Sequence, residues 1–223
     1  MSDNTNIHKD HRKRMRAKYN QNGPDIFADH ELLEMLLYHS QRQGNTNPTS
    51  HALLEKYPLG GIGKDISKLS EIHGIGECAA DLLRISGDTT LRLLQNAITA
   101  SPMDCDFAVS TYLWLWFLGK PEKCVAALML NSKNRFIGCS LIAEGRTARP
   151  EDYAAEVVSK MTECGAKKAV ICHNHADGDC SPSLEDLYLA SYLERELSDK
   201  GLTLLGNYIA TQSRCEKFCT DNK

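Results

Sequence analysis

Hydrophobic and polar positions divide the chain into two halves with different patterns. From residue 29 to residue 98, apolar side chains recur at helical spacing, and short polar or glycine-containing segments separate the runs. Asp29-His30-Glu31 is typical of a helix start, and the run behind it continues to Leu37. A second helix is predicted over residues 50–57, and the glycine-rich segment 58–64 predicts a turn. Residues 1–100 are therefore predicted to form an all-α domain.

Residues 66–86 predict two helices that pack closely across a tight turn. Apolar residues at 66, 69 and 72 are spaced for the first helix, and those at 79, 80, 82 and 83 for the second. The segment His73-Gly74-Ile75-Gly76 joins them, and a further helix is predicted over residues 90–98. Such a turn can direct backbone N–H groups at a phosphate, as helix N-termini do for other anions. The alternative is an αα-hairpin whose glycines only allow close packing.

Beyond Ser101-Pro102-Met103-Asp104, which we take as the domain boundary, the pattern changes to short apolar runs between helices. The continuous apolar run Cys124–Leu130 is typical of a buried strand, and a turn at 131–134 returns the chain as a second strand. Strands with intervening helices predict an α/β layered domain over residues 101–223. The expected elements are a helix at 112–118, strands at 124–130 and 135–143, a helix at 153–164 closed by Gly165, a strand at 169–172, a helix at 184–200 and a last strand at 202–210.

Composition is that of an ordinary globular protein, with 42% hydrophobic and 25% charged residues. No apolar run reaches membrane-spanning length, and no hydrophobic segment follows the charged N-terminus, so we expect neither a signal peptide nor a membrane span. The nine cysteines are odd in number and contain no C-x-x-C pair, which favours free thiols over a disulfide scaffold. These features predict a cytoplasmic location.

The charge distribution is less even than the net charge of -3 suggests. Between Lys9 and Lys18 the chain carries six basic residues and only one acidic residue. A basic run of this kind favours contact with phosphates, although a solvated helix face is the simpler interpretation. Nucleic acid is therefore kept as a partner of the N-terminal domain, through contacts that do not depend on base sequence.

The segment AVICHNHADGDCSPSLED carries the candidate chemistry. His173 and His175 lie two residues apart at the end of a predicted strand, so their side chains leave the same face. Asp186 lies in the first turn of the next helix, where its carboxylate can turn back toward the strand end. Two nitrogens and one oxygen suit zinc, and three protein ligands leave a fourth position for water. Ser183 and Asp186 also fit a capping box, which is compatible with a metal site because one residue can serve both.

This H-x-H-x7-S-x2-D pattern resembles the JAMM signature of the JAB/MPN metalloprotease superfamily. The chain resembles the bacterial RadC branch of that superfamily over nearly its whole length. The resemblance implies an N-terminal helix-hairpin-helix domain followed by a JAB/MPN domain, an α-β-α layered fold with a mixed sheet. It rests on HNHADGDCSPSLED, on CVAALMLNSKNRFI, on FADHELLEMLL, on TNPTSHALLEKY and on HGIGECAADLL. Two prolines of the RadC pattern HNHPSGDPTPS are replaced in this chain, by Ala176 and Cys180.

The resemblance also implies roles for individual residues. One zinc ion would be held by His173, His175 and Asp186. In the superfamily a glutamate beside the first core strand deprotonates the zinc-bound water, and the matching residue here is Glu122. Glu144 and Glu185 are the rival candidates for that base. Ser183 would donate a hydrogen bond to the oxyanion of a tetrahedral intermediate.

Three functions follow from these features. The first is a zinc-dependent hydrolase of peptide or isopeptide bonds. The second is a DNA-associated accessory protein whose MPN fold is a binding platform without catalysis, in keeping with the DNA-repair label that RadC relatives carry. The third, a nuclease that uses the same metal, is disfavoured because one zinc with one base is typical of amide hydrolysis. The intact ligand set favours the enzyme, and the basic N-terminal run favours DNA attachment.

Overall fold

In the computed structural model the described residues are 4–57, 69–120, 123–145 and 149–220. By their internal contacts the residues form two compact units, Met1–Leu91 and Arg92–Lys223. The division runs through one continuous helix, α5 (Glu77–Thr99), so the boundary near residue 101 stays a prediction. Among the described residues, no helix combines the length and the apolarity that a bilayer crossing requires. The cytoplasmic location likewise stays a prediction.

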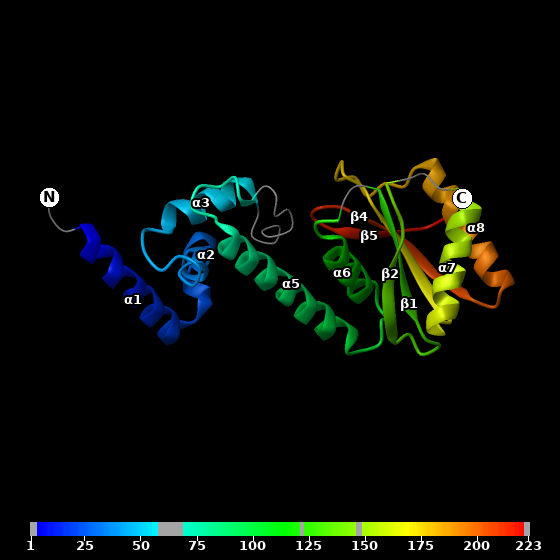
Figure 1. Ribbon diagram of the computed structural model, residues 1–223. Coiled ribbons are helices and arrows are strands. Elements are labelled where there is room, and N and C mark those ends of the chain that lie inside the picture. The colour runs from blue at the N-terminus through cyan, green and yellow to red at the C-terminus, as the bar shows by residue number, and fades with distance from the viewer. Residues whose placement is uncertain (1–3, 58–68, 121–122, 146–148, 221–223) are drawn as a thin grey trace. The chain divides into compact units, whose positions relative to one another are not determined.

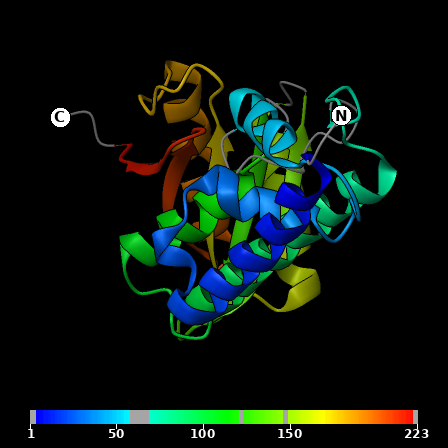
Figure 2. The ribbon, with the colours of Figure 1, turned by 90° about the vertical axis from the view of Figure 1, so that its left-hand side faces the viewer.

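The N-terminal unit is built from helices, as the sequence predicts (Figure 2). Its elements are α1 (Asn4–Asn22), the short 3₁₀ helix η1 (Pro24–Ile26), α2 (Asp29–Leu37), α3 (Asn47–Lys56) and the first part of α5. One apolar core joins α2, α3 and α5 through fully buried side chains such as Leu37, Leu53 and Leu83. The predicted turn at 58–64 and the first part of the predicted hairpin helix, residues 66–68, lie outside the described residues.

The helix predicted at 90–98 is not separate, because α5 runs without interruption from Glu77 to Thr99. Gly87 lies in the middle of α5, between the two helices that the sequence predicted. A single interior glycine costs a helix about 1 kcal/mol, which the favourable residues on both sides outweigh. Ala79 and Leu83, near the start of α5, belong to the core of the N-terminal unit, whereas Ile98, near its end, packs against a core of the C-terminal unit.

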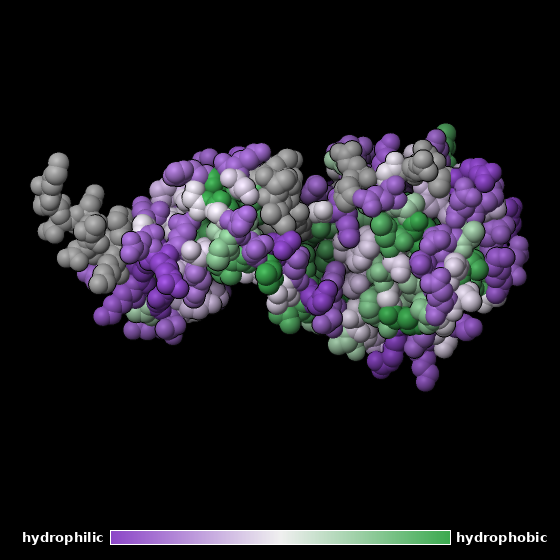
Figure 3. Space-filling model, in the orientation of Figure 1, coloured by the Kyte–Doolittle hydropathy of each residue, from purple (hydrophilic) through white to green (hydrophobic). Residues whose placement is uncertain are grey.

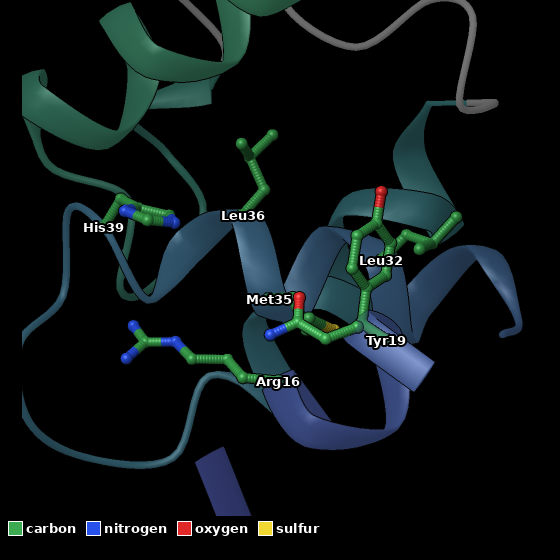
Figure 4. A pocket seen from close by; sticks show the side chains of 7 residues that line it. Arg16, Tyr19, Leu32, Met35, Leu36 and His39 are labelled. Carbon is green, nitrogen blue, oxygen red and sulfur yellow. The ribbon is translucent and has the colours of Figure 1, made fainter. Parts of the chain in front are cut away.

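Side chains within the basic segment of α1 attach this helix to α2 and to the loop that follows α2. Met15 is buried against Phe27 and Tyr38. The guanidinium of Arg12 donates hydrogen bonds to the backbone carbonyls of Gln41 and Gly44, at 2.7 and 2.9 Å. Farther along, α1 and α2 enclose a hollow of about 440 Å³ (Figure 4). Its lining comprises Arg16, Tyr19 and Asn20 from α1 and Leu32, Met35, Leu36 and His39 from the α2 segment.

The C-terminal unit contains a five-stranded mixed sheet in the order β2-β1-β3-β4-β5. β1 pairs antiparallel with β2 and β3, β3 pairs parallel with β4, and β4 pairs antiparallel with β5. The strands are β1 (Cys124–Leu130), β2 (Phe136–Glu144), β3 (Lys168–Asn174), β4 (Thr203–Ala210) and β5 (Cys215–Phe218). The sequence predicts the first four and misses β5, so the expectation that β4 is the last strand is wrong.

Helices cover both faces of this sheet (Figure 1). α6 (Asp106–Phe117) packs on one face, where Ala126 and Leu128 of β1 point. α7 (Pro150–Cys164) and α8 (Leu184–Asp199) pack on the other, where Ala127 of β1 points. The predicted α-β-α layers and mixed sheet are therefore confirmed. On the face of the unit turned to the viewer in Figure 3, apolar surface gathers over β1 and β2.

Candidate metal centre

The end of β3 and the start of α8 bring three metal-ligating side chains together. β3 pairs with both β1 and β4, which fixes the backbone at His173. His175 follows one residue after the strand ends, and its N–H donates to the carbonyl of Ala210 at 2.9 Å. Asp186 is the third residue of α8. One ligand atom from each of the three side chains lies within 4.8 Å of the others.

The spacing of these atoms suits a tetrahedral ion. His173 Nε2 lies 3.1 Å from His175 Nε2 and 3.1 Å from Asp186 Oδ1, and His175 Nε2 lies 3.6 Å from Asp186 Oδ2. Ligands held about 2.0–2.1 Å from a tetrahedral zinc lie about 3.3 Å from one another. The distance between the two histidine nitrogens and their distances to one or the other carboxylate oxygen lie on both sides of that value. The donor set of two imidazole nitrogens and one carboxylate oxygen also matches zinc chemistry.

The imidazole of His175 is held in the tautomer that a metal needs. Its Nδ1 lies 2.9 Å from the backbone carbonyl of Asp179. A carbonyl oxygen can only accept, so Nδ1 carries the hydrogen and Nε2 presents its lone pair to the cluster. The ring of His173 is contacted by the ring of Phe218 in β5, in an edge-on arrangement with ring centroids 6.1 Å apart.

Asp186 is oriented by Ser183, the residue that caps α8. The backbone N–H and the hydroxyl of Ser183 both donate to Asp186 Oδ2 at 2.7 Å, and the Asp186 N–H donates to Ser183 Oγ at 3.2 Å. Burial opposes ionisation of Asp186, but hydrogen bonds from His173 and Ser183 outweigh burial and hold its pKa well below the usual range. The carboxylate is therefore anionic, and the capping box and the candidate ligand coexist, as the sequence suggests.

A groove of about 640 Å³ opens beside the three candidate ligands, which form part of its lining. The start of β1, the first turn of α7, the end of β3 and the start of α8 supply its walls. Glu122, the base implied by the family resemblance, lies outside the described residues, but the next residues, Lys123 and Cys124, line the groove. Of the rivals, Glu185 lines the groove, and Glu144 is not among its described lining residues.

Two residues at the site, Asn174 and Phe218, were not identified from the sequence. Asn174, between the two histidines, accepts a hydrogen bond from the Cys124 N–H at 2.7 Å and so ties the start of β1 to the end of β3. Its position inside H-N-H could have marked it. Phe218 could not be found, because β5 has only four residues and was not predicted.

The turn proposed for DNA contact occurs as expected and precedes α5. Gly74 has φ of +91°, and a Cβ there would lie 2.6 Å from Thr49 Oγ1, so close packing on α3 accounts for this glycine. Its carbonyl accepts a hydrogen bond from the Gln41 amide. A Cβ on Gly76 would meet nothing within 4 Å, so the side of the turn at Gly76 is open.

Comparison with known proteins adds a family. The family model described as the RadC-like JAB domain matches residues 104–221, more than half of the chain. A UPF0758 protein of Rhodobacter capsulatus is 25% identical over 203 residues, which cover 90% of this chain and 95% of the relative. A UPF0758 protein of Fusobacterium nucleatum is 28% identical over 219 residues, covering 93% and 94%. A third, from Methylibium petroleiphilum, is 26% identical over 208 residues, covering 92% and 94%.

Proposed function

The chain belongs to the family of RadC-like JAB domains, and we propose that its C-terminal unit is a zinc-dependent hydrolase of peptide or isopeptide bonds. The observation that carries the proposal is the grouping of His173, His175 and Asp186 at near-tetrahedral spacing on the wall of an open groove. When bound, zinc supplies a Lewis acid that activates water for attack on an amide carbonyl. The groove supplies room for a substrate chain on the same side as the ligand atoms.

The chain's own residues would divide the remaining work. Glu122 would accept the proton of the attacking water and pass it to the leaving amine. Ser183 would donate to the developing oxyanion. Its hydroxyl donates to Asp186 in this structure, so that role requires the hydroxyl to turn toward the substrate. The Asp179 carbonyl would keep the His175 ring in place throughout, because its hydrogen bond does not involve the metal-facing nitrogen.

Elemental analysis of the purified full chain tests the metal assignment. We expect one zinc per chain in the wild type and loss of zinc in His173→Ala and in Asp186→Ala. His51→Ala is the matched control, because His51 is exposed on α3 in the other unit and stacks on His30. A wild type without zinc, or full zinc content in both site variants, would contradict the assignment. Activity is then measured on a panel of peptide and isopeptide substrates, where turnover by the zinc-loaded wild type is expected.

A second function, attachment of the N-terminal unit to DNA phosphates, is favoured by the side chains that α1 leaves exposed. Lys13 and Arg14 are exposed, unlike the half-buried Arg12. The open side of Gly76 at the start of α5 would add backbone donors. Glu77 in the first turn of α5 opposes an anion there, so α1 would contribute most of the attraction. A chain that holds zinc, binds DNA and hydrolyses nothing would favour the platform over the enzyme.

A further inference from the structure

Two large apolar side chains stand in solvent beside the candidate ligand Asp186. Leu184 is 83% exposed and Tyr188 is 62% exposed, and both lie in the first two turns of α8. They are four residues apart, so they share one face of the helix, whereas Ala190, Leu193 and Leu197 form its buried face. Exposed apolar side chains that cluster next to a groove indicate a contact surface more often than isolated ones do.

The same side chains line the groove that contains the three candidate ligands. Its walls beyond the ligands are largely apolar and include Val125 and Tyr153, which are nearly buried, and Leu189, which is partly buried. Lys123 and Glu185 carry opposite charges in the lining, so their charges offset each other and select neither an acidic nor a basic side chain. The distinguishing feature of this groove is therefore an apolar surface that adjoins the three candidate metal ligands.

We infer that this groove is a subsite for a bulky apolar residue of a peptide, with Leu184 and Tyr188 as its specificity-determining residues. The inference rests on the proposed function, because it takes the groove beside the ligands as the place where a peptide lies. An aliphatic or aromatic residue next to the scissile bond would cover Leu184 and Tyr188 and would contact Tyr153, which lines the same groove. Such contact removes apolar surface of both partners from water. Farther along α8, Tyr192 lies beside Tyr188, with ring centroids 6.5 Å apart, and extends the aromatic row.

Peptide binding to the full chain tests the subsite without requiring turnover. The probes are short fluorescein-labelled peptides of one polar sequence whose central residue is Leu, Phe, Gly or Glu, with fluorescence anisotropy as the readout. We expect the wild type to prefer the Leu and Phe peptides to the Gly peptide by about ten- to hundredfold, the range that burial of one such side chain allows. In the double variant Leu184→Ser, Tyr188→Ser, the ratio should fall toward one while zinc content stays at the wild-type level.

Phe107→Ser is the matched control, because Phe107 is 79% exposed on α6 and is not part of the groove lining. This variant should keep the wild-type ratio. A wild type that binds the four peptides equally, or binds none of them, overturns the inference, as does a double variant that keeps the preference. Sedimentation provides a further test. If the wild type is a dimer and the double variant is a monomer, a second copy of the chain covers Leu184 and Tyr188.

Failure of the subsite and failure of the proposed function give different results. Hydrolysis of the same peptides is followed by mass spectrometry with the zinc-loaded wild type. Preference for the Leu peptide without cleavage supports the subsite and contradicts the hydrolase. Cleavage of all four peptides at equal kcat/KM supports the hydrolase and overturns the subsite.

Discussion

Replacement of Ser183 separates two effects that the structure assigns to one side chain. Its Oγ accepts the Asp186 N–H as a helix cap and donates to Asp186 Oδ2 as an orienting contact. Ser183→Ala removes both, and loss of a serine cap costs about 1 kcal/mol of folding free energy. Removing a hydrogen-bond partner of a metal ligand typically weakens metal binding roughly 10–100-fold. We expect the lower end, about tenfold, because the Ser183 backbone N–H still donates to the same carboxylate oxygen.

Ser183→Gly and Ser183→Thr complete the test. Glycine caps a helix almost as well as serine, at a cost of a few tenths of a kcal/mol, but it cannot donate through a side chain. Zinc affinity of Ser183→Gly should therefore fall about tenfold while stability stays close to that of the wild type, and Ser183→Thr should preserve both. Affinity is measured by competition with a chelator, and stability by urea unfolding of the metal-free chain. If Ser183→Gly binds zinc as tightly as the wild type, the hydroxyl does not orient Asp186 and the reasoning fails.

Two further predictions concern the base and the N-terminal unit. Glu122→Gln should retain zinc and lose turnover by roughly a hundredfold to ten-thousandfold, the usual cost of removing a general base, whereas Glu185→Gln should remain active. The opposite result would move the base to Glu185. In the full chain, the double variant Lys13→Glu, Arg14→Glu should bind labelled duplex DNA more weakly than the wild type. The slope of log K against log salt concentration should become shallower by about one unit for each phosphate contact that is lost. Arg12 is left intact because it holds the α2–α3 loop, and absence of salt-sensitive binding by the wild type would leave the hairpin as a packing device.

The sequence predicts that the three candidate ligands lie close together, as they do, because their geometry is local. His173 and His175 share a strand end, and Asp186 follows in the first turn of the next helix, so residue spacing almost determines their directions. The buried strand β1 is equally clear, since all seven of its residues are apolar and buried. The predictions fail where the local residue pattern does not decide the structure. Gly87 does not break α5, and the four residues of β5 form a strand only because β4 offers an edge to pair with.

Tertiary contacts decide the remaining features. The charge of Arg12 suggests a phosphate contact, yet its guanidinium is occupied by two backbone carbonyls from a distant loop. Glu34 is only 2% exposed, although nothing in its helix marks it as a core residue. It is satisfied by Tyr38 on its own helix and by Asn47 at the start of α3, with His11 of α1 3.1 Å away. Composition cannot reveal such partners, because most of them lie on elements other than that of the residue they satisfy.

The difference between features set by local spacing and features set by tertiary contacts explains why a metal site is easier to predict from this chain than a substrate. The three candidate ligands lie within a 14-residue stretch from residue 173 to residue 186, and a single strand-loop-helix unit can position them. The groove beside them needs Val125 from β1 and Tyr153 from α7, which reach the ligands only after the sheet and its covering helices have formed. Substitutions that change groove walls can therefore alter peptide preference while the ligand set stays intact. The zinc measurements examine the local part of the site, and the peptide ratios examine the part that depends on the whole fold.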